Sequence, residues 1–211
     1  MKTIETEVQC SCCGAKVKVK ICVSRYIGDA GLDNKPENEE GFPILQKCPE
    51  CGYCDFSIGD DTCTSEMRKI VESAPYQALV NSKAKGTEIE KRLKAMQMLA
   101  ADSEKAAYLS MLLCWHYEWS GNKDTACAER RKAIGYLEKT FEKAVPVETV
   151  LIYIDSLRQL KEFMQAEETI QSVEEGMESC LTKDSLLYRV FQFEKQAVKR
   201  EDFRSHTLKE V

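Results

Sequence analysis

The chain has 211 residues, a net charge of −5 and a sequence pI of about 5.3. This charge argues against a uniformly basic surface that would coat nucleic acid. No apolar run approaches the 18 residues that suggest a membrane span, and the first residues contain no apolar segment typical of a signal peptide. We therefore expect a cytoplasmic protein with no membrane partner, built as one large domain or two small ones.

The cysteines are concentrated at one end of the chain. There are 11 in all, and a reducing compartment makes disulfides rare, so a dense cysteine cluster indicates a metal site. We predict a metal-binding domain over residues 1–63 and a helical domain over residues 64–211. The cysteines of the first segment are Cys10, Cys12, Cys13, Cys22, Cys48, Cys51, Cys54 and Cys63.

Two Cys-x-x-Cys-Gly motifs carry the strongest signal. Two residues between the cysteines let one tight turn direct both sulfurs at one ion, and the glycine that follows can adopt a positive φ. Two such turns supply the four thiolates of a closed tetrahedral zinc site. Cys12 is a rival to Cys13, but only Cys13 precedes a glycine. The predicted metal ligands are Cys10, Cys13, Cys48 and Cys51.

The identity of the metal is the next question. Rubredoxin, an iron electron carrier, uses similar motifs and shields its iron with aromatic residues near the first turn. Here Lys16, Lys18 and Lys20 follow that turn, and the first tryptophan is Trp115. We therefore expect one structural Zn²⁺, with iron as the alternative. The sequence leaves open whether Cys12, Cys22, Cys54 or Cys63 also takes part, and Cys22 is expected to fill the inner face of a strand as a small apolar residue.

The first segment has a strand pattern on either side of a polar stretch. Val17, Val19 and Ile21 alternate with lysines, which predicts a strand with one inward face. Residues 26–41 are rich in Gly, Asp, Asn and Pro, so we expect a solvated loop or hairpin tip there. A short apolar run over residues 41–47 predicts the returning strand of a small β zinc ribbon.

The second segment reads as a series of helices. Thr87 and Glu90 form a predicted capping box before a helix that contains Leu93 and Leu99. A short helix near residues 65–73 is expected to end at Pro75. The remaining helices are predicted near residues 103–119, 123–143, 147–159, 163–178 and 184–200. The predicted fold class is therefore α+β and mostly α.

A repeat with an offset of 40 residues is visible in the helical segment. Each copy has a large residue, a turn, a small residue and an apolar residue: Tyr117, Gly121, Ala126 and Ala133, then Leu157, Lys161, Ala166 and Val173. The pattern resembles the tetratricopeptide repeat (TPR), which is an antiparallel helical hairpin. We therefore predict a TPR-like array of hairpins.

If Gly121 marks the repeat turn, one helix face would line a partner groove. Aromatic residues and methionine suit such a groove, although the same spacing also fits a packed core. The predicted groove residues are Tyr108, Met111, Leu112, Trp115, Glu118 and Trp119 in the first copy, and Leu151, Ile152, Asp155, Arg158 and Gln159 in the second.

The order of these features resembles a family. The chain has an N-terminal Cys-x-x-Cys, then Cys48-Pro49-Glu50-Cys51-Gly52-Tyr53 followed shortly by Phe56, then TPR-like helices. In this it is similar to the bacterial family called domain of unknown function 2225 over nearly its full length. The resemblance implies the ribbon-plus-helices architecture and no activity. Cys54 and the extra Cys12 depart from the family pattern.

The sequence favours a binding role over catalysis. It has no nucleotide-binding glycine motif and no metalloprotease motif, and its two histidines are His116 and His206. A four-thiolate ion has no open position for a substrate. We predict a non-catalytic zinc protein that acts as an adaptor or scaffold for another protein or peptide. The alternatives are a nucleic-acid-associated zinc ribbon, with Lys16, Lys18 and Lys20 as a basic stripe, and a rubredoxin-like iron electron carrier.

Overall fold

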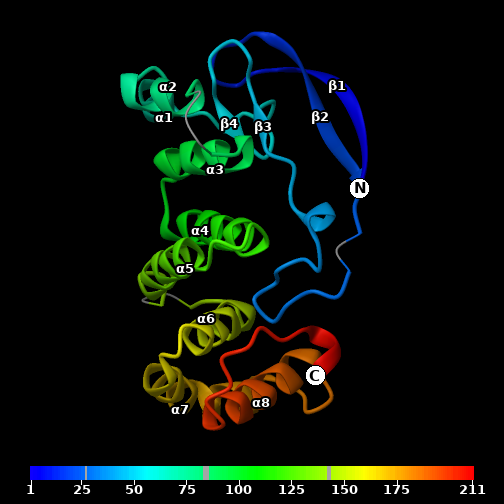
Figure 1. Cartoon of the computed structure of the whole chain (residues 1–211), viewed down its shortest axis with the longest axis vertical. Helices are drawn as coiled ribbons and strands as arrows, with labels where there is room; N and C mark the ends of the chain where they lie inside the picture. The colour runs from blue at the N-terminus through cyan, green and yellow to red at the C-terminus, as the bar shows by residue number, and fades with distance from the viewer. Residues whose placement is uncertain (27, 83–85, 142–143) are drawn as a thin grey trace.

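A computed structural model describes residues 1–26, 28–82, 86–141 and 144–211. The fold is α+β and mostly helical, as predicted, with the strands at the N-terminal end (Figure 1). The strands are β1 (Lys2–Gln9), β2 (Lys16–Ser24), β3 (Gln46–Lys47) and β4 (Cys54–Asp55). The α-helices are α1 (Ser65–Val71), α2 (Ala74–Val80), α3 (Glu88–Leu99), α4 (Ser103–Trp119), α5 (Lys123–Glu138), α6 (Val147–Gln159), α7 (Phe163–Cys180) and α8 (Leu186–Lys199).

The first two strands form a long antiparallel hairpin. Val8 lies opposite Val17 and Thr6 opposite Val19, and Val17 and Val19 are both buried. The predicted strand around residues 16–21 is therefore present, but its partner is β1 and not residues 41–47. The apolar run over residues 41–47 contributes only the two-residue strand β3, which pairs with β4. Strand β1 alternates charged and uncharged residues and contains few apolar side chains. For this reason the sequence does not predict the strand.

Helix α2 is absent from the prediction. Pro75 was expected to end a helix, but it lies in the first turn of α2, where its missing N–H group costs no hydrogen bond. Ser73 caps this helix by accepting a hydrogen bond from the backbone N–H of Tyr76. The predicted helix over residues 123–143 ends at Glu138, and residues 142–143 lie outside the described part of the chain.

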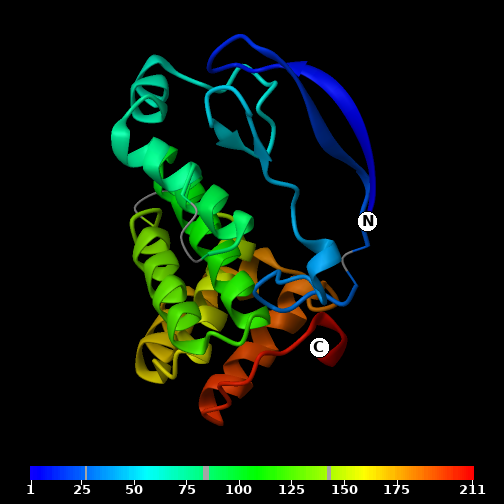
Figure 2. The ribbon, with the colours of Figure 1, turned by 45° about the horizontal axis from the view of Figure 1, so that its top comes forward.

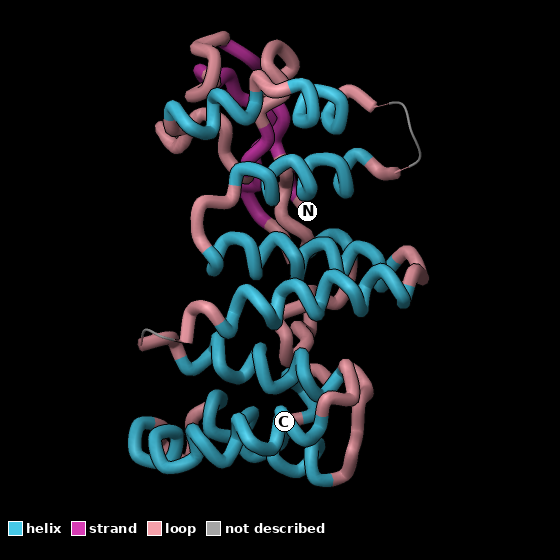
Figure 3. Tube along the Cα trace, turned by 90° about the vertical axis from the view of Figure 1, so that its left-hand side faces the viewer, coloured by secondary structure: helices cyan, strands magenta, loops and turns pink. Residues whose placement is uncertain are grey.

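The helices stack in the order of the sequence. Figure 3 shows successive layers from α1 and α2 at one end to α7 and α8 at the other. Helix α4 packs against α3 and α5, while α6 packs against α5, α7 and α8. One apolar cluster runs from the cysteine motifs through α1–α5, and a second fills the space among α5–α8. Side chains on both sides of the predicted boundary at residue 63 therefore share a core.

The 40-residue repeat corresponds to a repeated helix end. Gly121 has a φ of +76°, and Lys161, at the same place in the second copy, has a φ of +65°. Glu201, 40 residues further on, has a φ of +52° and ends α8 in the same way. In all three turns the residue that follows the positive-φ position donates its N–H to a carbonyl five residues back, the bond of the Schellman motif. These bonds are Asn122 to Tyr117 (2.8 Å), Glu162 to Leu157 (2.9 Å) and Asp202 to Ala197 (2.9 Å).

Residues 28–41, which we call the strap, leave the hairpin and cross the helices. This segment was expected to be solvated, but Gly31, Leu32 and Asp33 are buried. Figures 1 and 2 show it beside the C-terminal segment. There Leu32 donates its N–H to the carbonyl of His206 at 3.0 Å, and Leu208 donates to the carbonyl of Ala30 at 2.9 Å. The strap therefore joins the two ends of the chain.

Charged and aromatic side chains hold the strap on α4 and α5. The Asp33 carboxylate accepts hydrogen bonds from Trp115 Nε1 at 3.1 Å and from Arg130 at 3.0 Å. Lys35 Nζ forms an ion pair with Glu118 at 2.6 Å. Because the Asp33 and Arg130 side chains are almost fully buried, neither can exchange its partner for water. Asp33 therefore fixes the strap to the helix face.

Removing this carboxylate should destabilise the fold. We expect Asp33→Ala to lower the free energy of unfolding by about 3 kcal/mol, because it leaves the buried Arg130 with one carboxylate instead of two. The measurement is urea denaturation followed by circular dichroism. The matched control is Asp29→Ala in the same strap. Asp29 pairs with the exposed Lys209 at 3.7 Å, so this change should cost less than about 1 kcal/mol. Equal losses in the two variants would contradict the role given to Asp33.

Candidate metal centre

The four predicted ligand cysteines meet at one point. The sulfur atoms of Cys10, Cys13, Cys48 and Cys51 all lie within 4.8 Å of one another. Cys10 Sγ is 3.8 Å from Cys51 Sγ, and Cys13 Sγ is 3.8 Å from Cys48 Sγ. Each close pair joins one motif to the other, so a single ion between them would connect segments 35 or more residues apart in the chain.

The spacing of the sulfurs suits tetrahedral coordination. With metal–sulfur bonds of about 2.3 Å, a regular ZnS₄ tetrahedron has sulfur–sulfur edges of about 3.8 Å. The two measured contacts equal this edge. The structure therefore supports a metal site with four thiolate ligands, and zinc and iron both fit that geometry.

The two cysteine turns have the same backbone. Gly14 and Gly52 have φ values of +76° and +79°, and each donates its N–H to the carbonyl of the first cysteine of its motif, at 2.8 Å and 3.0 Å. That cysteine donates in turn to the residue just after the glycine, Cys10 to Ala15 and Cys48 to Tyr53, both at 2.8 Å. The glycine in each motif is thus explained by the turn that it closes.

The electrostatics of the site favour a cation. Burial and the neighbouring Cys48 raise the pKa of Cys10 to about 11, and burial likewise raises the pKa of Cys51 well above its usual range. Backbone N–H groups oppose this effect, and a hydrogen bond from Ala15 helps to hold the pKa of Cys13 below its usual value. Four thiolates this close repel one another, and a divalent cation removes the repulsion.

Helix α2 holds the second cysteine turn in place. Tyr76 Oη donates to the carbonyl of Gly52 at 3.2 Å and accepts from the N–H of Cys54 at 3.1 Å. Gln77 Nε2 donates to the carbonyl of Cys51 at 2.8 Å. Both side chains support the site, and both were missed because the sequence did not reveal the helix that carries them. The Ser73–Tyr76 cap spacing is the signal that would have found it.

The remaining cysteines of the first segment lie outside the group of four. Cys54 is buried and donates its thiol hydrogen to the carbonyl of Gly52 at 3.3 Å. Cys12 is buried beside Cys63, and burial raises its pKa to about 11. Cys22 was expected on an inner face, but it is exposed. The group of four contains Cys13, which precedes a glycine, and does not contain its rival Cys12.

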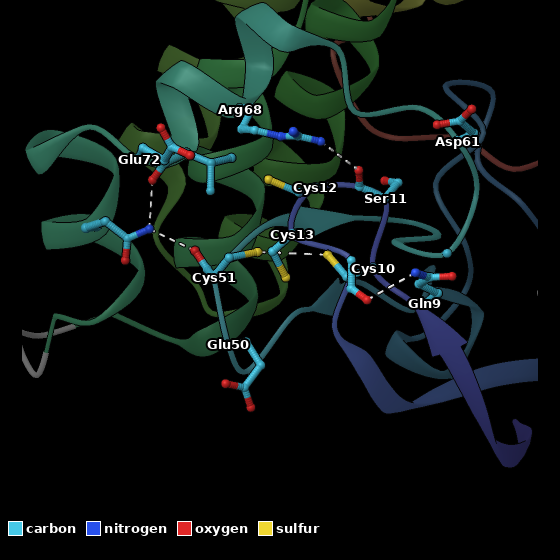
Figure 4. Close-up of a pocket in the computed structure, with 14 residues that line it drawn as sticks. Gln9, Cys10, Ser11, Cys12, Cys13, Glu50, Cys51, Asp61, Arg68 and Glu72 are labelled. Carbon is cyan, nitrogen blue, oxygen red and sulfur yellow. Dashed lines mark hydrogen bonds between the residues drawn. The ribbon is translucent and has the colours of Figure 1, made fainter.

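One side of the cysteine group is open. A depression of about 1010 Å³ borders it, and Figure 4 shows Cys10, Cys13 and Cys51 along this depression with Arg68 and the acidic residues around them. Cys13 is exposed, whereas Cys10 and Cys48 are buried. Glu50, Asp61 and Glu72 line the depression, so a metal ion can approach the sulfurs along an acidic surface.

Most of the first-copy residues predicted to line a partner groove are largely covered within the chain. Leu112 is fully buried in the core, and Met111 and Trp115 are each only 4% exposed. Tyr108 is exposed and Trp119 half-buried. The strap covers part of this predicted face, where Asp33 binds Trp115 and Lys35 lies 5.4 Å from the Trp119 ring centroid. Tyr108, Met111, Trp115 and Ile152 line a cavity beside the strap.

Arg158, a predicted groove residue of the second copy, is also buried. Its guanidinium binds Asp155 and Glu194 and donates to the carbonyls of Asp202 and Arg204, each at 2.7 Å. Arg158 therefore ties α6 to α8 and to the turn that follows it. Its role is to join elements within the chain, so the assignment of Arg158 to a partner surface is wrong.

The proposed basic stripe of β2 is interleaved with acidic residues. In the register of the hairpin, Lys18 lies opposite Glu7 and Lys20 opposite Glu5. Adjacent carboxylates repel phosphate groups, so this face does not provide a continuous cationic surface.

His116 Nε2 hydrogen-bonds Thr87 Oγ1 at 2.9 Å, which is a structural contact.

Comparison with protein-family models finds no matching family, and comparison with curated proteins and with solved structures finds no match. Among the described residues, no helix is both long and apolar enough to cross a membrane. The functional argument therefore rests on the geometry of the chain itself.

Loss of one ligand should unfold the metal-binding end and spare the other. We expect Cys48→Ser to abolish stoichiometric metal binding and to expose residues 1–24, residues 42–63 and α1–α3 to rapid hydrogen exchange, because these segments share the first apolar cluster. Helices α6–α8, in the second cluster, should stay protected. Mass spectrometry of hydrogen–deuterium exchange measures both ends at once.

Cys22→Ser is the matched control for this experiment. Cys22 is exposed and lies outside the group of four, so this variant should keep both its metal and its exchange pattern. Uniform loss of protection along the Cys48→Ser chain would contradict a metal effect confined to the first cluster.

Proposed function

We propose that the cysteine group binds one structural Zn²⁺ and that the protein serves as a non-catalytic adaptor for another protein. The metal assignment rests on one observation: four cysteine sulfurs from two matching turns lie at tetrahedral spacing. Four protein ligands saturate a zinc ion, so this centre would stabilise the fold and leave no position for a substrate.

The surroundings of the sulfurs support zinc over iron. Cys13 faces an open depression with polar and charged residues, whereas an electron-transfer iron gains its potential from a shielding apolar shell. A rubredoxin-like carrier therefore remains the weaker proposal. The nucleic-acid alternative is weaker again, because Glu5 and Glu7 lie opposite the lysines on which it depends.

Three features support the adaptor role. The helices stack through a repeated turn at Gly121, Lys161 and Glu201, an architecture that generates extended binding surfaces. This arrangement agrees with our proposal that the hairpins are TPR-like and with the resemblance to domain of unknown function 2225. Finally, the face of α4 and α5 holds a turn of the strap through Trp115, Arg130 and Glu118, and this contact supports a role for the face in recognising a polypeptide.

Purification from the native host tests both parts of the proposal. We expect one zinc per chain in protein prepared anaerobically, no visible absorption, and a second protein in a fixed ratio. Elemental analysis and native mass spectrometry measure these quantities. Native expression is required because iron-rich overexpression loads iron into zinc sites.

Stoichiometric iron with visible absorption would contradict the zinc assignment. A chain that elutes alone at its monomer mass, from a lysate in which it is fully folded, would contradict the adaptor role. The two results are independent of each other.

A further inference from the structure

Two pockets lie on either side of Tyr108, near the junction between β2 and α4. The first is a pocket of about 360 Å³ whose wall includes Lys20, Ile21, Arg25, Ile44, Phe56 and Tyr108. The second is a mostly apolar cavity of about 220 Å³ between α4 and α6, whose lining includes Ala107, Tyr108, Met111, Trp115, Leu137 and Ile152. Tyr108 lines both, so we call the whole the Tyr108 groove.

The Tyr108 groove is distinct from the strap-covered surface. The strap residues Asp33 and Asn34 form one wall of the apolar cavity, and the strap separates this cavity from the side chain of Trp119, which borders a different pocket. The 220 Å³ cavity is larger than an engineered cavity of about 150 Å³ that binds benzene. It therefore has room for one large apolar side chain.

The other part of the groove has a positive rim. Lys20 and Arg25 line it, and no Asp or Glu does so among the described residues. Within the part of the chain that the structure describes, Arg25 makes no ion pair. The Tyr108 ring packs against Phe56 with 5.7 Å between centroids. The rim thus offers an uncompensated guanidinium beside an aromatic surface.

The edge of β2 supplies main-chain groups to the same pocket. Gln46 Nε2 donates to the carbonyl of Lys20 at 3.3 Å, so the backbone groups of Lys20 face away from β1. Because this orientation alternates along an antiparallel strand, the N–H and carbonyl of Cys22 face the same way, and Cys22 lines the pocket. An extended segment can pair with this edge.

The strap provides an internal example of such recognition. Its turn at Gly31–Asn34 presents the Asp33 carboxylate, and the same helix face holds this carboxylate through Trp115 and Arg130. The Tyr108 groove repeats the chemistry on the other side of the strap, with an aromatic wall formed by Phe56 and Tyr108 and a guanidinium from Arg25.

We propose that the Tyr108 groove binds an extended acidic segment of a partner protein, which places a large apolar side chain between α4 and α6 and a carboxylate beside Arg25. This inference rests on the adaptor role proposed above and specifies its binding site. The segment lies along the edge of β2, and its negative charge complements the rim of the first pocket.

Nuclear magnetic resonance of the metal-loaded full-length chain tests the site. The probe is a pool of acetylated octapeptides in which Asp or Glu alternates with Leu, Phe or Met, and the comparison pool carries Lys in place of the acids. We expect the acidic pool to shift amide resonances of Ile21–Arg25, Ala107–Met111 and Ile152, and the basic pool to leave them unchanged.

Variants on the rim then separate this site from others. Tyr108→Ala and Arg25→Glu should each weaken binding of the acidic pool about tenfold or more, in the range of interface hot spots. Both residues are exposed, so the fold should persist, and an unchanged spectrum of the free variant checks this. Lys18→Glu is the control, since it makes the same kind of charge reversal as Arg25→Glu on the same strand outside the groove.

Three results would overturn the inference: equal binding of both pools, shifts centred on Trp119 and the strap, or no binding of the acidic pool. A native partner that binds Tyr108→Ala and Arg25→Glu as tightly as the original chain would also overturn this site. That last result would leave the adaptor role intact, because the partner would dock elsewhere.

Discussion

The close approach of four cysteine sulfurs is the constraint on which the N-terminal end of the structure depends. The sulfurs of Cys10, Cys13, Cys48 and Cys51 are held within 4.8 Å by two rigid turns, and their burial opposes ionisation of Cys10 and Cys51. A bound cation reverses this balance, because it stabilises the thiolates and joins the two turns. The small strands β3 and β4 are too short to hold those turns together by their own hydrogen bonds.

The metal centre is coupled to the helices through packing. Tyr76 and Gln77 of α2 bind the backbone of the second turn, and the surrounding apolar cluster continues into α4 and α5. At the far end, the strap pairs with the C-terminal segment beside His206. The cysteine-bearing end is therefore joined to the helical stack both by the shared core and by the strap, which lies on α4 and α5.

The sequence predicted those parts of the structure that depend on local chemistry. The two Cys-x-x-Cys-Gly motifs identified the four clustered cysteines because each turn needs its glycine at a positive φ. The 40-residue repeat identified the equivalent turns at Gly121 and Lys161, which share a positive φ although only the first is a glycine. Helix signals in the sequence, including apolar residues at helical spacing, predicted α3–α8 close to their observed positions.

The errors concern contacts between distant segments. Asp33 looked like a solvated loop residue, and only its pairing with Arg130, 97 residues away, makes it a buried one. The same contact explains why Trp115 is covered rather than free. Strand β1 was missed because pairing with β2, rather than its own composition, defines it. Long-range pairing of this kind has no local signal in a single sequence.

X-ray absorption spectroscopy at the zinc edge measures the proposed coordination directly. Protein loaded with one equivalent of Zn²⁺ should show four sulfur neighbours at about 2.3 Å and no nitrogen or oxygen in the first shell. A first shell that contains three or fewer sulfurs, or nitrogen or oxygen ligands, would contradict the assignment of Cys10, Cys13, Cys48 and Cys51 as a closed four-thiolate site.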